Sequence, residues 1–241
     1  MPLSNFKAVV FDYDGTLFDT RPAIINCLRR AFEECGRTVP ALDAVADAVT
    51  TGLTLPETVL ALDPRLRNDR TALNELVVTY RKLYGDEGRQ WLRPFPGAAQ
   101  ALRRLHRSGA KCIVVSNKGI EAIRRSLDEA GLSQFIDLAL GDAPGMPNKP
   151  DPAIVTAVIL PRYSQLQRHQ ILMVGDTEVD ILFARRAGIP CCWASYGYGQ
   201  TDRCRKLAPD HEIAAISELP ALVLAKPLPL HGGGQRWRAP A

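Results

Sequence analysis

The chain has 241 residues, enough for one large domain or for a domain that carries an insert. Apolar residues make up 46% and charged residues 23%, the usual balance of a globular protein. The net charge of +4 is small, and the arginines fall in pairs along predicted helices, a pattern typical of solvated faces. No apolar run approaches the roughly 18 residues that cross a bilayer. We therefore expect neither a nucleic-acid partner nor membrane association.

The six cysteines bear on the location of the protein. They show no C-x-x-C spacing, and Cys112 and the pair Cys191–Cys192 lie in predicted core strands. We expect no signal peptide ahead of them. Reduced thiols in a cytoplasmic protein are therefore expected. The sequence leaves open whether the protein is a monomer or a homodimer.

The first predicted element is a buried strand that ends in two acids. The apolar run from Phe6 to Phe11 is followed directly by Asp12 and, two residues later, by Asp14. Residues i and i+2 of an extended backbone share a face, so we expect both carboxylates to point into one small space. Two crowded carboxylates repel each other, but with a metal ion between them they form a nucleophile and an acid/base.

Residues 18–92 show helical patterns and no convincing strand. Their apolar residues form two stripes, Ile24, Leu28, Phe32 and Cys35 in one and Leu73, Leu76, Val77, Tyr80 and Leu83 in the other. This block predicts an all-helical cap over the strand ends, with hinges near residues 18–20 and 92–96. The loop Thr51–Thr54 between two cap helices either contacts substrate or is a plain turn around glycine.

Short apolar runs alternate with helical patterns in the rest of the chain. Runs at 110–115, 135–140, 171–174 and 190–194 have the length of buried parallel strands. Helical patterns occupy residues 120–130 and follow the predicted N-caps Asp151 and Thr177. This alternation predicts an α/β fold, a Rossmann-like parallel sheet with helices on both faces. Residues 1–17 and 93–226 would form this core, and residues 227–241, which lack apolar periodicity, are predicted to be disordered.

Polar residues follow the predicted strands at their carboxyl ends. Ser116–Asn117 follow the second strand, Asp176 follows the run 171–174, and Lys149 lies in the loop before the next helix. Ligands of an open parallel sheet bind beyond the carboxyl ends of its strands, so we expect these residues to converge with Asp12 and Asp14. Carboxylate oxygens suit Mg²⁺, and lysine and hydroxyl donors suit phosphoryl oxygens. The set therefore predicts a phosphomonoester site.

Each of these residues also has a purely structural interpretation when it is taken alone. Asp14–Gly15 and Ser116–Asn117 are common turn pairs, and Lys149 before proline is commonly a solvated side chain. Asp180 can complete the capping box of its own helix. The loop 196–199 either lines the site or only connects two elements. The joint pattern favours an active site, because chance would have to bring every residue to the same sheet edge.

Four segments, in this order, resemble the motifs of the haloacid dehalogenase-like hydrolase superfamily. They are Asp12–Leu17, Ser116–Asn117, Lys149–Pro150 and Gly175–Asp180. The similarity covers residues 6 to about 224, and the helical insert resembles the cap of phosphoglycolate phosphatase-like members. The dehalogenases of the superfamily lack the second aspartate, so Asp14 indicates phosphoryl chemistry.

The resemblance implies a role for each residue. Asp12 attacks phosphorus and forms an aspartyl-phosphate that water hydrolyses. Asp14 protonates the leaving oxygen and later accepts a proton from the attacking water. Ser116, the backbone of Asn117 and Lys149 bind the phosphoryl oxygens.

Mg²⁺ is the cofactor that the resemblance implies. It is held by Asp12, Asp176 and the backbone carbonyl of Asp14, and Asp180 holds a water in its second coordination shell. The cation cancels the repulsion between an anionic nucleophile and an anionic phosphate.

The sequence therefore favours a Mg²⁺-dependent phosphatase that acts on a small phosphorylated metabolite. 2-Phosphoglycolate is the best candidate on the resemblance alone. A β-phosphoglucomutase-like phosphomutase uses the same first motif, and hydrolysis of pyrophosphate or nucleotides uses the same chemistry. A non-catalytic binding protein on the same fold is a further alternative, although it has no physical need to crowd the acids.

Overall fold

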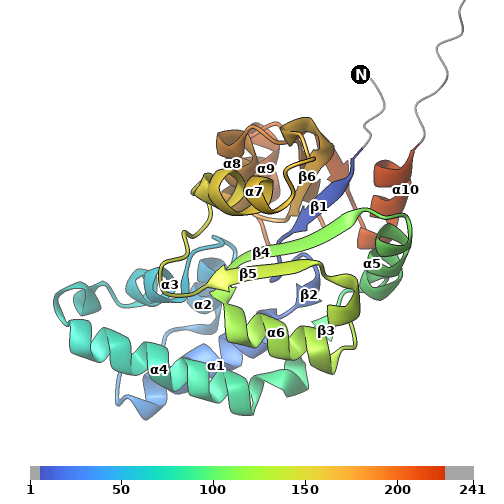
Figure 1. Cartoon of the computed structure of the whole chain (residues 1–241). Helices are drawn as coiled ribbons and strands as arrows, with labels where there is room; N and C mark the ends of the chain where they lie inside the picture. The colour runs from blue at the N-terminus through green and yellow to red at the C-terminus, as the bar shows by residue number, and fades with distance from the viewer. Residues whose placement is uncertain (1–5, 226–241) are drawn as a thin grey trace, which may run out of the picture.

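The computed structural model describes residues 6–225, and a parallel six-stranded sheet lies at the centre of this part of the chain (Figure 1). The strand order is β5-β4-β1-β6-β7-β8, and each neighbouring pair is parallel. In that order the strands span Leu138–Asp142, Lys111–Gly119, Ala8–Phe11, Ile171–Gly175, Cys191–Ala194 and His211–Ile213. Val10 of the buried strand β1 lies opposite Ile113 of β4 and Met173 of β6. A strand with neighbours on both sides and helices on both faces is continuously apolar, as the sequence of β1 is.

Successive residues of β1 face opposite sides of the sheet. Val9 and Phe11 pack into one buried cluster, and Ala8 and Val10 pack into another. Helices α5, α6 and α10 cover the first cluster, and α7, α8 and α9 cover the second (Figure 1). In chain order these helices span Ala98–Arg107, Ile120–Glu129, Leu160–Arg162, Glu178–Ala187, Thr201–Lys206 and Leu219–Leu224. Helices on both faces of a parallel sheet confirm the predicted fold class.

A helical block follows β1 and returns to the sheet through a short antiparallel ribbon. Strand β2 (Phe18–Asp19) pairs with β3 (Arg93–Pro94). Between them lie α1, α2, α3 and α4, with the 3-10 turns η1 and η2. These elements span Arg21–Glu34, Leu42–Val49, Leu55–Leu62, Arg70–Asp86, Pro64–Asn68 and Gly88–Trp91 respectively. Leu28 and Phe32 of α1 pack with Leu76 and Tyr80 of α4 in a core separate from the sheet (Figure 1).

Several strands differ from the sequence-based expectation. The short strand β8 was not predicted, because only Ile213 of its three residues is apolar. Strand β4 continues to Gly119, with a register shift after Val115, so Ser116 and Asn117 lie within the strand rather than after it. The predicted strand at 135–140 begins later, because Ser133–Phe135 form the 3-10 turn η3. Strand β2 lies in the block that was predicted to be all helical; two residues are too few to produce an alternation.

The helix predicted after Asp151 is irregular. Asp151 Oδ1 accepts a hydrogen bond from the Ala153 N–H at 2.8 Å, as an N-cap does. The segment then runs as the π-helix η4 (Ile154–Ile159) before α7. The remaining short turns, η5 and η6, span Arg168–Gln170 and Ile216–Glu218. Within residues 6–225 no helix combines the length and apolar character needed to cross a membrane. The tail predicted to be disordered, 227–241, lies outside the described residues.

Candidate active site

Asp12 lies at the carboxyl edge of the sheet, immediately after β1. Its backbone N–H donates to the Val174 carbonyl at 2.8 Å, which extends the pairing of β1 with β6 by one residue. Lys149 Nζ donates to Asp12 Oδ1 at 2.7 Å, and both side chains are buried. The predicted nucleophile and the predicted phosphate-binding lysine therefore form a buried ion pair, although 137 residues separate them in the sequence.

Asp176, directly after β6, is held from several sides. Its Oδ1 accepts from Thr16 Oγ1 at 3.0 Å, and its Oδ2 accepts from the Tyr198 N–H at 2.7 Å. The Trp193 indole donates to its backbone carbonyl at 2.8 Å. Gly15 packs against the carboxylate so closely that a Cβ there would lie 2.2 Å from Asp176 Oδ2, and its φ of +79° also favours glycine. Glycine at position 15 of the first motif is therefore required by packing as well as by its turn.

Asp180 caps its own helix, as one of the two interpretations of the sequence predicted, and it also contacts Lys149. Its Oδ2 accepts from the backbone N–H and from Oγ1 of Thr177, both at 2.9 Å, which completes the capping box of α8. Its Oδ1 accepts from Lys149 Nζ at 2.5 Å. The helix cap therefore fixes a fully buried carboxylate beside the lysine.

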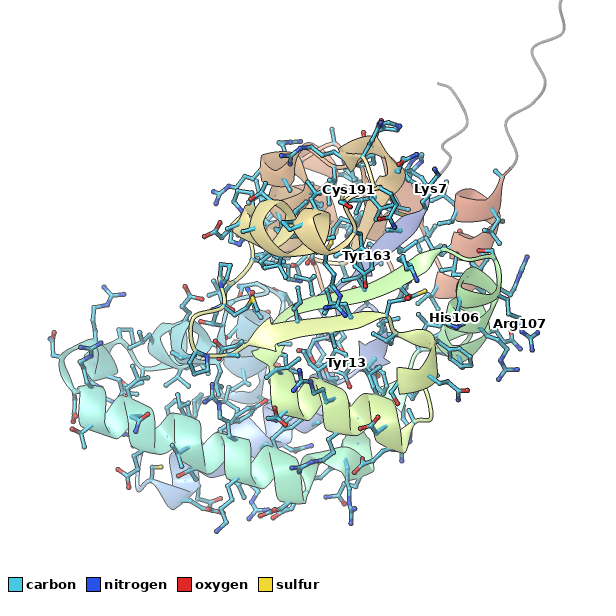
Figure 2. The ribbon with its side chains drawn as sticks, in the orientation of Figure 1. Lys7, Tyr13, His106, Arg107, Tyr163 and Cys191 are labelled. Carbon is cyan, nitrogen blue, oxygen red and sulfur yellow. The ribbon has the colours of Figure 1, made fainter. Side chains whose placement is uncertain are left out.

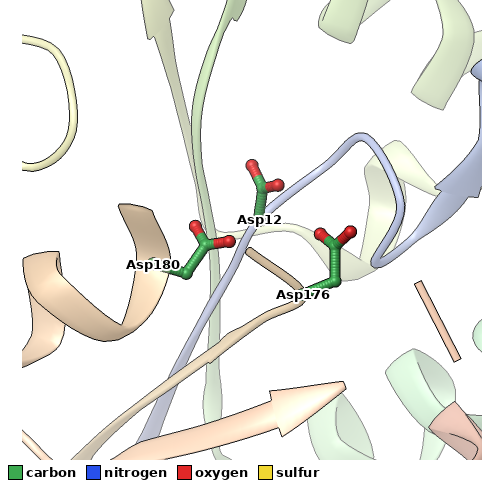
Figure 3. Close-up of side chains that lie close together, drawn as sticks. All are labelled: Asp12, Asp176 and Asp180. Carbon is green, nitrogen blue, oxygen red and sulfur yellow. The ribbon is translucent and has the colours of Figure 1, made fainter. Parts of the chain in front are cut away.

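Asp12, Asp176 and Asp180 form an acidic nest. One carboxylate oxygen from each lies within 4.8 Å of the others, and the three side chains converge on a common space (Figure 3). Burial raises the pKa of Asp12 to about 7, with a further increase from Asp180, even though Lys149 opposes both effects. Burial and the charges of Asp12 and Asp180 also raise the pKa of Asp176.

The charge balance of the nest favours a cation. Burial disfavours the charged form of Lys149, but the carboxylates of Asp12 and Asp180 outweigh it and raise the pKa of the lysine. Lys149 contacts two of the three acids, Asp12 and Asp180, so the nest with all three acids ionised carries more negative charge than one ammonium balances. Hard carboxylate oxygens with this charge fit Mg²⁺.

Asp14 has a different partner from Asp12. The motif turns after the strand, where the Gly15 N–H donates to the Phe18 carbonyl at 2.9 Å. Asp14 Oδ1 then accepts from Lys118 Nζ at 3.0 Å, outside the nest. Its side chain is 22% exposed, against 9% for Asp12. The two acids line one cavity, but each is paired with its own lysine.

Ser116 and Asn117 lie where β4 reaches the same edge. Ser116 is buried and lines the cavity with Asp12 and Asp14. The Asn117 side chain accepts from the Lys149 N–H at 2.8 Å and donates to the carbonyls of Lys149 at 3.0 Å and Gly52 at 2.9 Å. This side chain therefore fastens both the Lys149 loop and a cap loop, a function that the sequence did not predict.

The cavity beside these residues has a volume of about 690 Å³ and lies between the sheet edge and the helical block. The helical block contributes mainly apolar and aromatic side chains to its lining, among them Ile24, Leu28, Val49, Leu53, Leu55, Tyr80 and Tyr84. Gly52 and Leu53 belong to the predicted loop Thr51–Thr54, which therefore reaches the cavity. Pockets of this size and composition are typical of small-molecule sites.

Comparison with known proteins identifies the family. Residues 9–194 match the family model of the haloacid dehalogenase-like hydrolases. The chain belongs to this family. A phosphoglycolate phosphatase of Cupriavidus necator is 30% identical over 217 residues, which are 90% of this chain and 92% of that protein. The pyrophosphatase PpaX of Halalkalibacterium halodurans is 28% identical over 225 residues, 92% of this chain and 99% of that protein.

Solved structures agree with this assignment. A haloacid dehalogenase-like family protein from Streptococcus pneumoniae superimposes with a TM-score of 0.76 at 26% identity and covers 90% of this chain and 98% of its own. A predicted phosphoglycolate phosphatase from Haemophilus somnus has a TM-score of 0.78 at 23% identity, with 90% and 97% coverage. The resemblance inferred from the four motifs is therefore confirmed.

Sequence reasoning missed Lys118 at the site of this hydrolase, and it considered the loop 196–199, whose Tyr198 lines the cavity, without predicting its contact. Lys118 contacts Asp14; because it shares a strand face with Ser116, its position could have revealed it. The Tyr198 hydroxyl accepts from the backbone N–H groups of Thr20 at 2.6 Å and Arg21 at 2.9 Å. Tyr198 thus ties the loop 196–199 to the start of α1, and no local pattern could have indicated this contact.

A third site contact involves the first motif itself. The Tyr13 side chain reaches α6, where its hydroxyl is hydrogen-bonded to Ser126 (Figure 2). Tyr13 is fully buried and stacks on Phe18 with ring centroids 4.7 Å apart. It therefore anchors the turn that carries Asp12 and Asp14 on either side of it.

Proposed function

We propose that this hydrolase is a Mg²⁺-dependent phosphomonoesterase that works through an aspartyl-phosphate on Asp12. The main support is the buried nest of three carboxylates around one ammonium, with Asp14 at the rim of the same cavity. A nucleophile, a cation site and an acid/base in one cavity are the parts that in-line displacement at phosphorus needs. Relatives that carry the name phosphoglycolate phosphatase support the same reaction class.

The chain's own residues divide the reaction into two steps. In the first, the Asp12 carboxylate forms a bond to phosphorus while the bond to the ester oxygen breaks, and Asp14 gives a proton to the departing oxygen. In the second, water attacks the phosphorus of the aspartyl-phosphate and gives a proton to Asp14. Inorganic phosphate leaves, and the Asp12 carboxylate is restored.

Electrostatics decides whether the first step can proceed. Two like charges at ~4 Å repel by about 4 kcal/mol at an effective dielectric of 20. Lys149 supplies one permanent positive charge beside Asp12, and Ser116 and the Asn117 N–H supply donors for the phosphoryl oxygens. Mg²⁺, held by Asp12, Asp176 and the Asp14 carbonyl with Asp180 behind them, would supply the remaining positive charge.

Among possible substrates, 2-phosphoglycolate is the first candidate. It is the compound in the names of several relatives, and pyrophosphate is the compound in the name of the relative from Halalkalibacterium halodurans. The apolar and aromatic lining on the cap side of the cavity favours a carbon-containing leaving group over pyrophosphate. A phosphomutase would use the same nucleophile but would have to return the phosphoryl group to a sugar.

The test is phosphate release by the purified protein in Mg²⁺ and in EDTA. Substrates are 2-phosphoglycolate, 2-hydroxyethyl phosphate, p-nitrophenyl phosphate and pyrophosphate, with glucose 1-phosphate plus a bisphosphate primer as the mutase assay. We expect Mg²⁺-dependent hydrolysis of the monoesters and, for Asp12→Asn, a loss of about 10⁴-fold or more in kcat. Failure to hydrolyse any monoester, or full activity in Asp12→Asn, would refute the proposal.

A further inference from the structure

The helical block leaves apolar side chains partly uncovered where it faces the cavity. Residues 6–225 leave five large apolar side chains exposed, and Leu53, at 40% exposure, is the one of them that lines the cavity. Ile24, Val49 and Leu55 line the same side and are half-buried. We call these four side chains the apolar wall. Apolar surface in contact with water is unfavourable, so a ligand that covers this wall gains by binding there.

The helical block offers little polar contact to a ligand in the cavity. Thr58 Oγ1 already donates to the Thr54 carbonyl at 2.9 Å, and the Tyr84 hydroxyl is itself buried. Among the described residues that line the cavity, Arg81 is the one cation from the helical block, and it pairs with Asp142 at 2.9 Å. A charged leaving group would therefore lose hydration against this side without gaining an unpaired cation from it.

The apolar wall belongs to the same cavity as the predicted nucleophile. Asp12 and Asp14 line that cavity at the sheet edge, and its volume is about 690 Å³. Cavities of about 300–1,000 Å³ hold drug-sized molecules, whereas glycolate is among the smallest alcohols that carry a carboxylate. An ester with its phosphoryl group at the nest therefore has room for a leaving group much larger than glycolate.

We infer that the substrates of this enzyme are phosphate monoesters of apolar alcohols, whose alkyl or aromatic bodies of about six or more carbons pack against the apolar wall. This inference rests on the proposed phosphatase function and adds the chemical class of the leaving group. The phosphoryl group lies at the nest, and the body of the alcohol lies against the helical block. 2-Phosphoglycolate fills the nest end of the cavity and leaves the apolar wall uncovered, so it is the weaker substrate.

The test is a series of esters that differ in apolar length alone. These are ethyl, butyl and hexyl phosphate in Mg²⁺, with 2-phosphoglycolate for comparison. All three alkyl esters release a primary alcohol of similar pKa, so a change in kcat/KM reports contact with the cavity rather than leaving-group chemistry. Each buried methylene contributes about 4-fold, so we expect kcat/KM to rise by at least about 50-fold from ethyl to hexyl phosphate. The kcat/KM for hexyl phosphate should also exceed that for 2-phosphoglycolate.

A pair of variants tests whether the apolar wall causes this preference. Leu53→Asn places a polar group on the wall, and because Leu53 is exposed the change should leave the fold intact. We expect the hexyl-to-ethyl ratio of kcat/KM to fall by about 10-fold. Leu42→Asn is the control, because Leu42 is 54% exposed on α2 and lies outside the described lining of the cavity. This variant should keep the wild-type ratio.

The outcomes separate this inference from the proposed function. If ethyl phosphate is hydrolysed but kcat/KM does not rise with chain length, the inference is wrong and the phosphatase function stands. A higher kcat/KM for 2-phosphoglycolate than for hexyl phosphate overturns the inference in the same way. Equal falls in the ratio for Leu53→Asn and Leu42→Asn would contradict a role for the apolar wall. The wild-type series decides the inference even if Leu53→Asn fails to fold. If the protein hydrolyses no monoester, the proposed function and this inference fail together.

Discussion

The two walls of the cavity are built differently. On the sheet side, Asp12, Asp176 and Asp180 are each held by polar contacts from separate strands, loops or helix caps. On the cap side, the lining is mainly apolar, and the Tyr84 hydroxyl is buried without a partner among residues 6–225. A preorganised polar wall can stabilise developing charge, whereas an apolar wall binds by shape and is tolerant of change. We therefore expect the chemistry to depend on the sheet edge and the choice of substrate to depend on the helical block.

Contacts around the rim connect the two walls. Asn117 Nδ2 donates to the Gly52 carbonyl at 2.9 Å on one side, and Arg81 pairs with Asp142 at 2.9 Å on another. A Cβ on Gly52 would lie 2.6 Å from Thr177 Oγ1, so this cap loop packs directly on the first turn before α8. The cap wall thus rests on the residues that hold the nest.

After the loss expected for Asp12→Asn, the largest effect on the sheet side of the cavity should follow from Asp14→Asn. The amide cannot give a proton to the leaving oxygen, and general acid catalysis is worth about 10²- to 10⁴-fold. We expect kcat on 2-phosphoglycolate to fall within this range and kcat on p-nitrophenyl phosphate to fall much less, because nitrophenolate leaves without a proton. Steady-state kinetics on both esters measures the difference. Asp128→Asn, an exposed acid on α6, is the control, and equal losses on both esters would contradict an acid role for Asp14.

The next largest effect should follow from Gly15→Ala, which disturbs the packing against Asp176. Gly15→Ala puts a Cβ 2.2 Å from Asp176 Oδ2 and keeps a φ of +79°, so both the contact and the backbone are strained. We expect a loss of about 3 kcal/mol in unfolding free energy and at least about 10-fold in activity.

The control for this variant is Gly131→Ala. Gly131 has a φ of +66° but open space around the Cβ position, so this variant should lose only about 1 kcal/mol. Urea unfolding of both variants measures the difference. Similar losses would mean that backbone conformation alone, and not contact with Asp176, requires glycine at position 15.

Loss of the Tyr198 contacts, which connect the two walls of the cavity, should lower the unfolding free energy by a smaller amount. Tyr198→Phe removes the acceptor for the Thr20 and Arg21 N–H groups and the donor to Asp19 Oδ1, which lies 2.8 Å away. We expect a loss of about 2 kcal/mol in unfolding free energy. Because the contact lies at the start of α1, we also expect KM for the monoesters to rise. Tyr163→Phe is the control.

Tyr163 is buried in the cluster that packs on the Ala8 and Val10 side of β1 (Figure 2). Among residues 6–225 its hydroxyl forms no hydrogen bond. Its replacement should change the unfolding free energy by less than about 0.5 kcal/mol. Chemical denaturation measures the unfolding free energy of both variants, and initial-rate kinetics measure their KM. An unchanged KM for Tyr198→Phe would show that this tyrosine stabilises the fold without positioning the cap.

The sequence was sufficient for features that repeat or that end an element. The apolar runs predicted the central strands, and the rule that ligands bind at strand ends correctly placed Asp12, Ser116 and Asp176 at one edge. Asp180 is an instructive case, because its capping spacing and its place in the motif suggested two different roles. In the structure one carboxylate oxygen completes the predicted capping box and the other accepts from Lys149, a contact that was not predicted; the role in holding a metal-bound water stays a prediction.

What the sequence could not predict depends on contacts between distant segments. The Asn117 side chain bonds to Lys149 and Gly52, which are 32 and 65 residues away, and no local pattern encodes such a choice. Strand β8 owes its position to pairing with β7 rather than to its own composition. Tyr84 belonged to no predicted stripe, yet its place on α4 brings it to Lys118. These contacts decide how the cap wall meets the polar wall.

The smallest predicted effect is a pH-dependent response to Mg²⁺. The pKa of Asp12 rises from 3.8 to about 7 in the folded protein without metal. The folded state therefore binds more protons than the unfolded state between about pH 4 and pH 7, and the unfolding free energy falls as pH rises through this window. On the proposed function Mg²⁺ would bind the ionised nest and restore this loss, so we expect it to raise the melting temperature by about 2–4 °C more at pH 8 than at pH 5.

Thermal unfolding in Mg²⁺ and in EDTA at both pH values measures this difference. Asp12→Asn cannot ionise at this position, so its melting temperature in EDTA should change less between pH 5 and pH 8 than that of the wild type. The Mg²⁺ increment should shrink in the same variant, because one carboxylate of the nest is gone. An increment that is equal at both pH values in the wild type would mean that the cation binds away from Asp12, and that the polar wall is neutralised by Lys149 alone.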